Sequence, residues 1–381
     1  MRASYFCKKL SELGIDTVSG VPDSLLKNFC EYLDKSQNGE TDDGIKFKHF
    51  TAENEGGAAG ICAGAYLATG RPACLYMQNS GIGNVVNPIC SLFHRDVYDI
   101  PLLMLVGWRG EPGVKDEPQH VFQGKATIKL LEDMDIETFV VSKDTTDEEV
   151  NELFETLGKL LKDNRQCAVV VKKGTFVDEK SRAKTNGRDY VREEAIGDIL
   201  KLIGENDPVF STTGKISREV YEQSDKIYGN HSRCFLTVGS MGHTSMIAFG
   251  YKANHPEKRV FCIDGDGAVL MHMGSMAFIA EQQPENFVHI VINNNAHESV
   301  GGMDTAAKHA DFAAIAKDCG YKNVYIAENK EELEKAFAAI ENNTELTLIE
   351  VRVALGARDD LGRPKETPRE NKAVFMEKVN G

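Results

Sequence analysis

The sequence contains no apolar run near the roughly 20 residues that a membrane-spanning helix needs; segments such as Ile100–Val106 have only the length of a buried strand. Positive charge is in deficit, because 44 Lys and Arg stand against 58 Asp and Glu, for a net charge of −14. Nucleic acid is bound by basic surfaces, so a chain of this charge is not expected to bind it. We expect neither nucleic acid nor a membrane as a partner.

Paired cysteine motifs are also missing. The nine cysteines form no CxxC pair, their number is odd, and most lie in apolar segments. Buried, reduced thiols of a cytoplasmic protein are therefore expected. The first residues lack the apolar stretch of a signal peptide, and Glu12 and Asp16 are unlike a transit peptide, which supports the same location.

The 381 residues are enough for two domains, and predicted strands alternate with helical patterns along the whole chain. This alternation predicts an α/β protein whose parallel sheets carry helices on both faces. A charged and polar segment near the middle lacks periodicity, and we place the linker there. The expected parts are a first domain at 1–175, a linker at 176–190 and a second domain at 191–381. Strands are predicted at 16–19, 46–50, 73–78, 101–107 and 167–172, and then at 207–211, 234–237, 260–264, 288–292, 321–326 and 345–352.

The most informative motif is Gly265-Asp266-Gly267, which directly follows a predicted strand. A helical pattern over 268–281 leads to the next strand, and Asn293–Asn295 follow that strand. Ligands of open α/β sheets bind where strands end, so a carboxylate and an amide oxygen should meet there. Such oxygen ligands suit a Mg²⁺ ion that also holds a diphosphate.

Two familiar binding loops fit this motif less well. A dinucleotide-binding fingerprint needs a third glycine, but position 270 is Leu, and Asp266 would repel a bare pyrophosphate. A calcium-binding EF-hand loop starting at Asp264 needs a Glu at its twelfth position, which is Ser275. The plain structural alternative is a glycine-rich turn with surface asparagines.

A second group of residues lies in the first half. A helix is predicted to begin within Glu53–Gly60, and it contains Glu55 followed by small residues. An acid at a helix start can simply interact with the helix dipole, so capping is one possible role of Glu55. The stretch continues with Thr69-Gly-Arg-Pro72, a predicted strand, and then Ser80-Gly-Ile-Gly-Asn84.

Together the two groups resemble the thiamine diphosphate-dependent decarboxylases and acetolactate synthases, over nearly the whole chain. The resemblance implies that Glu55 hydrogen-bonds N1′ of the aminopyrimidine, that Met241 props the cofactor in a bent form, and that the Gly239 carbonyl receives its 4′-amino group. Asp266, Asn294 and the Ala296 carbonyl match the metal ligands. Larger relatives insert a third domain, which is missing here, so FAD is not expected. The residues implied to bind the cofactor are Glu55, Thr213, Gly214, Gly239, Ser240, Met241, Gly265, Gly267, Ala268 and Asn294.

The family also forms its active sites between subunits, so self-association is implied. Two stretches then bear on the substrate. Asp23 and Ser24 occupy a place where the family has a substrate-facing polar residue, although a turn and helix cap accounts for them equally well. The charged loop 107–125 contains His120, a candidate for proton transfer, and Arg109 and Lys115, which could clamp an anionic group. A solvated loop is the alternative.

Three segments, Gly20–Leu26, Asp116–His120 within this loop, and Asn294–Gly302, resemble the family of the phosphonopyruvate decarboxylases. The resemblance implies thiamine diphosphate- and Mg²⁺-dependent conversion of phosphonopyruvate, a small anionic 2-oxo acid, to phosphonoacetaldehyde and CO₂, in phosphonate biosynthesis. Sulfopyruvate decarboxylase is the nearest alternative. An acetolactate synthase-like carboligase and a non-enzymatic scaffold are further ones, although intact Glu55, Asp266 and Asn294 argue against a scaffold. His297, Glu298 and Ser299 follow the metal-binding motif and receive no role from the sequence.

Overall fold

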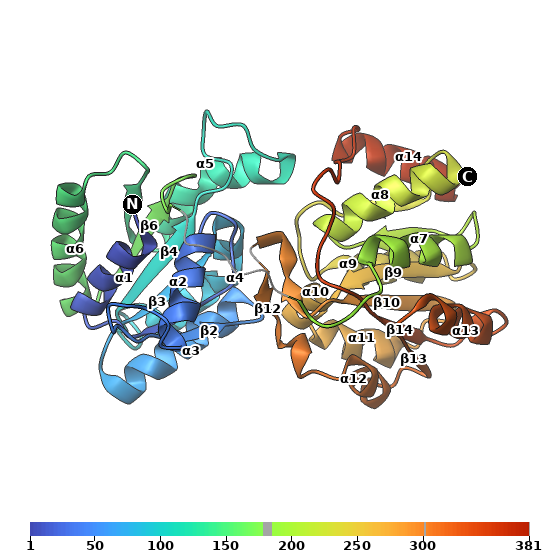
Figure 1. The fold of residues 1–381 in the computed structure, drawn as a ribbon, viewed down its shortest axis with the longest axis horizontal. Coiled ribbons are helices and arrows are strands. Elements are labelled where there is room, and N and C mark those ends of the chain that lie inside the picture. Colours follow the sequence, from blue (N-terminus) through green and yellow to red (C-terminus); the bar gives the residue numbers. More distant parts are fainter. Residues whose placement is uncertain (178–184, 301, 381) are drawn as a thin grey trace. The chain divides into compact units, whose positions relative to one another are not determined.

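The structure is a computed structural model that describes residues 1–177, 185–300 and 302–380, without the side chain of Ser299. The chain divides into two compact units, Met1–Arg182 and Ala183–Gly381 (Figure 1). The linker that the sequence predicts at 176–190 includes 178–184, which lie outside the described residues.

Within the described residues, unit 1 is built on a six-stranded parallel sheet of order β2-β1-β3-β4-β6-β5. The central strands β4 and β6 are buried along their full length, as expected of parallel strands covered on both faces. The strands are β1 (Thr17–Gly20), β2 (Lys48–Thr51), β3 (Ala73–Gln78), β4 (Leu102–Gly107), β5 (Glu137–Val141) and β6 (Gln166–Val171).

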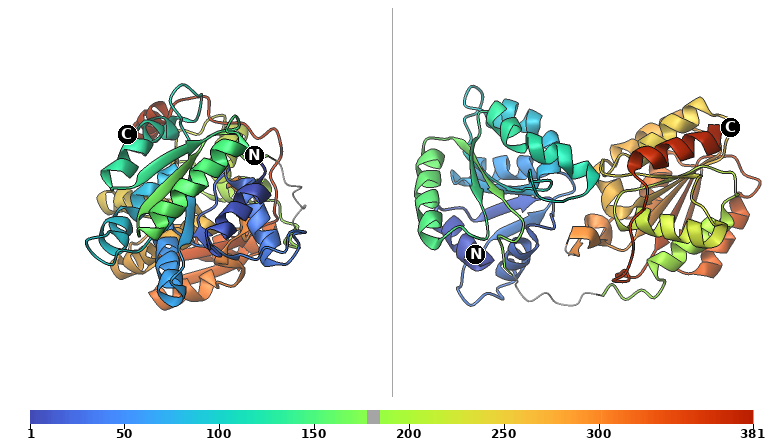
Figure 2. Two further views of the ribbon diagram at one scale, coloured as in Figure 1. Left: turned by 90° about the vertical axis from the view of Figure 1, so that its left-hand side faces the viewer. Right: turned by 90° about the horizontal axis from the view of Figure 1, so that it is seen from above.

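Helices cover both faces of this sheet (Figures 1 and 2). On one face, aromatic rings of α1, α2 and α6 pack edge to face around Phe6. On the other, α3, α4 and α5 pack on alternate residues of β3 and β4. The helices are α1 (Ala3–Glu12), α2 (Lys27–Gln37), α3 (Glu55–Thr69), α4 (Ile82–Asn87), α5 (Pro118–Asp133) and α6 (Asp147–Lys162), with a 3-10 helix at Asn79–Gly81 and a π-helix at Pro88–Phe93.

Unit 2 repeats the design. Its six-stranded parallel sheet has the order β13-β14-β10-β9-β7-β8 over the residues that are described. A small antiparallel hairpin follows β10. The strands are β7 (Val209–Ser211), β8 (Cys234–Leu236), β9 (Val260–Gly265), β10 (Phe287–Asn293), β11 (Ala296–His297), β12 (Met303–Asp304), β13 (Asn323–Ala327) and β14 (Thr347–Arg352).

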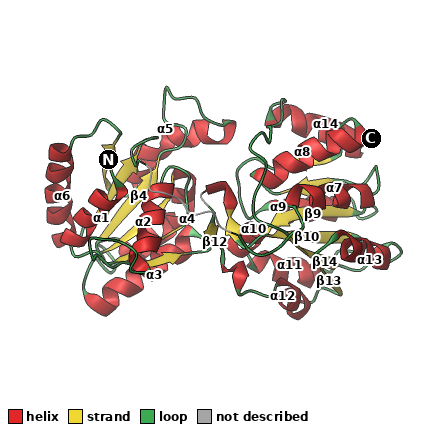
Figure 3. Ribbon diagram, viewed as in Figure 1, coloured by secondary structure: helices red, strands yellow, loops and turns green. Residues whose placement is uncertain are grey.

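Two apolar clusters form the core of unit 2. One lies under α7, α8 and α13, and the other under α9, α11, α12 and α14, which cover the opposite face (Figure 3). The helices are α7 (Arg192–Leu202), α8 (Lys215–Tyr228), α9 (Thr244–Asn254), α10 (Asp266–Met271), α11 (Gly274–Gln282), α12 (Phe312–Cys319), α13 (Lys330–Ile340) and α14 (Pro368–Asn380), with 3-10 helices at Glu298–Val300 and Ala306–Lys308.

The predicted fold class, two α/β thiamine diphosphate-binding domains with parallel sheets covered on both faces, is confirmed. Two details differ. The sequence prediction lacked β5, an edge strand whose residues are mostly half-buried or exposed, so it shows no continuous apolar run. The helix predicted over 268–281 is two helices, because the backbone of His272 leaves the helical region at φ −136° and ψ 49°.

The cysteines all lie within the described residues and are free thiols. Among the helices that the structure describes, none combines the length and the apolar character needed to cross a membrane.

Candidate functional site

The parallel sheets of both units place loops at the carboxyl ends of their strands, and the predicted site residues lie in or next to these loops. In unit 1, Glu55 is the first residue of α3, after β2, and it is 5% exposed. Asn54, not Glu55, caps the helix, because its side chain accepts a hydrogen bond from the Gly57 amide at 2.8 Å. Capping therefore does not account for the Glu55 carboxylate.

Two neighbours hold the Glu55 side chain. The Asn84 amide donates to Glu55 Oε2 at 2.7 Å. Gly81 lies so close that a Cβ at this position would overlap the carboxylate. The glycine and the asparagine of the Ser80–Asn84 motif thus shape the space around Glu55, a relation that the motif itself did not reveal.

A second cluster of unit 1 joins the ends of β1, β3 and β4. Asp23 is fully buried, accepts hydrogen bonds from Gln78 Nε2 at 2.7 Å and from the Leu25 amide at 3.0 Å, and leaves no room for a Cβ at Gly107. Burial raises the pKa of the Asp23 carboxyl, against the hydrogen bond from Gln78. Ser24, next to it, accepts from Arg109 NH1 at 3.2 Å.

Arg109 is already engaged in an ion pair. Its Nε donates to Asp116 Oδ2 at 2.8 Å, and its NH2 donates to the other oxygen of the same carboxylate. This pair lowers the pKa of Asp116 and raises that of Arg109. The remaining nitrogen of the guanidinium, NH1, donates to Ser24 and not to Asp116. Lys115, the other predicted anion ligand, is exposed.

His120 lies in the first turn of α5 and is 8% exposed. Its Nδ1 is buried without a hydrogen-bond partner in the described structure. Burial, together with the charge of Arg109, lowers the pKa of His120 to about 4. The imidazole is therefore neutral near pH 7.

In unit 2, Asp266 lies at the start of α10, directly after β9. Its carboxylate accepts from Thr305 Oγ1 at 2.7 Å and from the backbone amides of Gly267 and Asn295. Burial nevertheless raises the pKa of Asp266 to about 6. A divalent cation beside this carboxylate would offset the cost of burying its charge, so Asp266 is a candidate metal ligand.

Asn294 follows β10, which pairs with β9 so that Ile292 lies opposite Gly265. Its Nδ2 donates to Glu298 Oε2 at 2.8 Å, and its Oδ1 accepts from the amide of Ala296 at 3.0 Å. The sequence missed Thr305 and the contact with Glu298, because neither lies in a recognisable motif. The pairing of β9 and β10 brings Asp266 and Asn294 to the same end of the sheet.

The other predicted cofactor residues surround this end. Gly214 has φ +95° and leads into α8, and Thr212, two residues earlier, has a buried hydroxyl without a partner among the described atoms. The Gly239 amide donates to Thr213 Oγ1 at 3.1 Å. Gly239 and Ser240, at φ +71° and +46°, make the tight turn that carries Met241.

Gly267 lies close to Met241, a predicted cofactor residue, and to His297, which the sequence left without a role. A Cβ at this position would lie 3.2 Å from the His297 ring and 3.4 Å from Met241 Cε. Burial lowers the pKa of His297 to about 4, so its ring is neutral near pH 7. Gly265 and Ala268 lie on either side and are buried.

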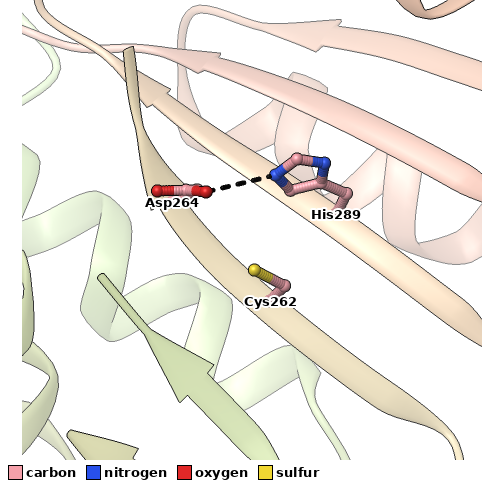
Figure 4. A group of neighbouring side chains, drawn as sticks. All are labelled: Cys262, Asp264 and His289. Atoms are coloured by element: carbon pink, nitrogen blue, oxygen red, sulfur yellow. Dashed lines mark ion pairs between the residues drawn. The ribbon is translucent and has the colours of Figure 1, made fainter. Parts of the chain in front are cut away.

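Beneath this loop is a buried group of possible metal ligands, Cys262, Asp264 and His289 (Figure 4). Asp264 Oδ2 lies 3.6 Å from His289 Nε2, and its Oδ1 accepts from the Gly265 amide at 3.0 Å. Burial raises the pKa of the Cys262 thiol, which disfavours the thiolate that metals bind. Among the described residues this set also falls short of a closed four-ligand site. We interpret it as support for the Gly265–Gly267 loop.

Comparisons with known proteins match both halves of the chain to one family. Residues 2–154 match the family described as "Thiamine pyrophosphate enzyme, N-terminal TPP binding domain", and residues 219–351 match "Thiamine pyrophosphate enzyme, C-terminal TPP binding domain". Thiamine pyrophosphate is another name for thiamine diphosphate.

Curated relatives match nearly the whole chain. A phosphonopyruvate decarboxylase of Streptomyces viridochromogenes is 36% identical, with 95% of this chain and 90% of the relative covered. One of Streptomyces hygroscopicus is 34% identical, with 98% and 93% covered. A sulfopyruvate decarboxylase of Methanosarcina acetivorans is 26% identical, with 97% and 96% covered.

Proposed function

Because the chain belongs to the thiamine pyrophosphate enzymes, in the family of the phosphonopyruvate decarboxylases, we propose that it converts phosphonopyruvate to phosphonoacetaldehyde and CO₂. The observation that carries this proposal is the similarity to two phosphonopyruvate decarboxylases over nearly the full length of both chains. The reaction is non-oxidative: the bond between the carboxylate and the carbonyl carbon breaks, and a proton takes the place of CO₂. It would serve phosphonate biosynthesis.

The residues of unit 2 fit thiamine diphosphate with a Mg²⁺ ion. Asp266 offers a buried carboxylate whose raised pKa a nearby cation would lower again. Thr212, beside the positive-φ turn at Gly214, offers a hydroxyl that has no partner among the described residues. The side chains of Asp266 and Asn294 and the Ala296 carbonyl would hold the metal. When bound, thiamine diphosphate supplies a nucleophilic carbon and accepts the electron pair that CO₂ leaves behind.

In unit 1, Glu55 would hold the proton at N1′ of the aminopyrimidine. Asn84 engages Oε2 of this carboxylate, and the other oxygen, Oε1, lies beside Gly81. Asp23, Ser24 and His120 would face the substrate. His120, neutral near pH 7, can accept a proton from solvent when the anionic substrate lies beside it and deliver it to the product carbon.

The anion clamp is a proposal about Arg109 and Lys115. Because Asp116 occupies two nitrogens of Arg109, a phosphonate would bind at NH1, beside Ser24, or displace Asp116. Lys115 is exposed and could move onto the same group. A phosphonate with two negative charges competes for Arg109 against the singly charged Asp116 carboxylate better than a singly charged sulfonate does. This difference favours phosphonopyruvate as the substrate.

A decarboxylation assay over phosphonopyruvate, sulfopyruvate and pyruvate, with added thiamine diphosphate and Mg²⁺, tests the proposal. Phosphonopyruvate should give the highest kcat/KM. A higher value with sulfopyruvate would establish the alternative that the Methanosarcina relative represents. A preference for pyruvate of more than about tenfold would reject the anion clamp. Release of a condensation product instead of an aldehyde would reveal a carboligase.

We also propose that the protein works in the cytoplasm as a homo-oligomer, with active sites between subunits. The free thiols of all nine cysteines suit a reducing compartment. Exposed apolar side chains of helix α3, Ile61 and Leu67, offer area for a subunit contact. Light scattering at several protein concentrations measures the assembly.

A further inference from the structure

The amide group of Asn294 has a defined orientation. Its nitrogen faces the carboxylate of Glu298, at 2.8 Å from Oε2. A carboxylate only accepts hydrogen bonds, so it selects the NH₂ end of the amide and turns Oδ1 the other way. The backbone amide of Ala296 donates to Oδ1 of Asn294 at 3.0 Å, which is consistent with this orientation. An oxygen directed away from Glu298 is what a hard cation needs from an asparagine.

Glu298 is itself fixed by two cations from different helices. Lys215, the first residue of α8, places Nζ 3.0 Å from Glu298 Oε1. Arg192, the first residue of α7, donates from NH1 to Oε2. The guanidinium of Arg192 is held in turn by Glu219, through bonds of 2.7 and 2.8 Å, and both side chains are almost completely buried.

The backbone on both sides of the Asn294 side chain is held by the segment that enters unit 2. Asn186 Nδ2 donates to the carbonyl of Asn294 at 3.0 Å and to that of Val353 at 2.9 Å. Arg188 NH1 donates to the carbonyl of Asn293 at 2.6 Å. Side chains at 186, 188 and 192 therefore converge on the loop that carries the proposed metal ligands.

We propose that Glu298 is a positioning residue that orients the Asn294 amide for the divalent cation, and that residues 186–192 brace the loop in this state. The proposal rests on the proposed function, because it assumes that Asn294 binds the metal. The carboxylate does not touch the metal; it aligns a ligand, and Arg192 and Lys215 align the carboxylate. Such outer partners of metal ligands commonly change metal affinity about 10- to 100-fold when they are replaced.

The test is the affinity of the Glu298→Gln variant for Mg²⁺ and Mn²⁺ with thiamine diphosphate present. Calorimetry measures Mg²⁺ binding, and the paramagnetic resonance signal of free Mn²⁺ gives a reading that does not depend on turnover. A glutamine amide can face Asn294 with either end and leaves two cations unpaired. We expect about 10- to 100-fold weaker metal binding, with kcat restored to near the wild-type value at saturating Mg²⁺.

Glu222→Gln is the matched control. Glu222 lies on the same helix α8 as Lys215, accepts from the Gly362 amide at 2.7 Å and pairs with Arg358, so its partners lie outside the metal loop. If loss of an ion pair weakened the fold in general, both variants would lower the melting temperature and the metal affinity together. A positioning role changes metal affinity in Glu298→Gln alone.

A reciprocal exchange sharpens the test. In Asn294→Asp two carboxylates face each other, whereas in Asn294→Asp with Glu298→Gln the amide and the carboxylate trade places. The double variant should bind metal more tightly than either single variant, which is a coupling that independent effects do not produce. If Glu298→Gln does not fold, Glu298→Asp, which withdraws the charge by one methylene, should show the same loss.

Metal affinity within about twofold of wild type in whichever Glu298 variant folds, or strictly additive effects in the double variant, would overturn the proposal. Failure of the proposed function looks different. In that case the wild-type protein itself would show no binding of Mn²⁺ that depends on thiamine diphosphate.

Discussion

At the scale of single residues, the side chain of Glu55 and the missing side chain of Gly81 fit together. Gly81 ends a 3-10 helix after β3, and a Cβ there would overlap the Glu55 carboxylate. Asn84 then sets which oxygen of Glu55 is engaged, through its 2.7 Å hydrogen bond. The position of this carboxylate thus depends on a glycine that makes no polar contact of its own with it.

We predict that Gly81→Ala removes most activity because the new methyl group displaces Glu55. General acid–base groups commonly contribute about 10²- to 10⁴-fold, so kcat should fall by a factor in this range, close to that of Glu55→Gln. Gly83→Ala is the control, since a Cβ there meets nothing within 4 Å and favours helix α4. Steady-state kinetics at saturating cofactor measures kcat of both variants. A near-normal kcat in Gly81→Ala would show that the position of Glu55 does not depend on a glycine at 81.

His120 makes stability depend on pH. Its pKa is about 4 in the folded protein and about 6.5 in an unfolded chain, so between these values the unfolded state binds more protons. The contribution of His120 to stability is therefore complete above pH 6.5 and is lost as the pH falls toward 4.

We subtract the unfolding free energy of wild type from that of His120→Asn. This difference should increase as the pH falls from 7 to 5, by at most about 1.4 kcal/mol per pH unit, because only the wild type loses the contribution of His120. Urea unfolding of both proteins at pH 7, 6 and 5 measures this difference, in which the other histidines cancel. A difference that does not change with pH would show that His120 is not shielded from protonation.

At the scale of elements, the loop after β4 lies directly on helix α5. A Cβ at Gly124 would overlap the backbone of Gly110, and one at Gly110 would overlap the carbonyl of His120. The Trp108 ring nitrogen donates to the Gly124 carbonyl at 2.8 Å. The contact holds the loop that carries Arg109 and therefore sets its place relative to His120.

Gly124→Ala should push this loop away from α5 and raise KM for the substrate. Misplacement of a binding group by about 1 Å can cost on the order of 10²-fold, so we expect kcat/KM to fall by at least tenfold while the affinity for thiamine diphosphate is unchanged. Gly250→Ala, on the open surface of α9, is the control. An unchanged KM would mean that the loop does not contribute to substrate binding.

At the scale of the whole molecule, the two candidate halves of the site belong to different compact units, with Glu55 in unit 1 and Asp266 in unit 2. The proposed self-association assigns the two halves of each active site to different subunits. This arrangement has a consequence that can be measured without a structure of the assembly.

Neither Glu55→Gln nor Asp266→Ala should be active alone. After the two are mixed and allowed to exchange subunits, about a quarter of the sites should combine an intact Glu55 with an intact Asp266, and activity should return to about that fraction. Two samples of the same variant, mixed in the same way, are the control. Persistent inactivity of the mixture, with exchange verified by mass spectrometry, would place both residues of a site in one subunit.

The sequence was sufficient to predict the fold class because the pattern of apolar residues along the chain indicates which segments are buried. Strands β4 and β6 are buried throughout and largely apolar, and both were predicted. Strand β5 was missed because an edge strand, covered on fewer sides, has no such pattern. The same limit applies to the site: Glu55, Asp266 and Asn294 stand in motifs, whereas Thr305 reaches Asp266 across 39 positions without one.

The sequence by itself determined the chemistry that the chain can perform. Glu55, Asp266 and Asn294 have their functional groups wherever they are placed, and their motifs, with the family matches, identify the cofactor. The tertiary structure decided how these groups are oriented and charged. It paired Arg109 with Asp116, raised the pKa of Asp266 by burial and turned the Asn294 amide toward Glu298. Those properties arise from contacts between distant segments and from exclusion of water, which exist only once the chain has folded.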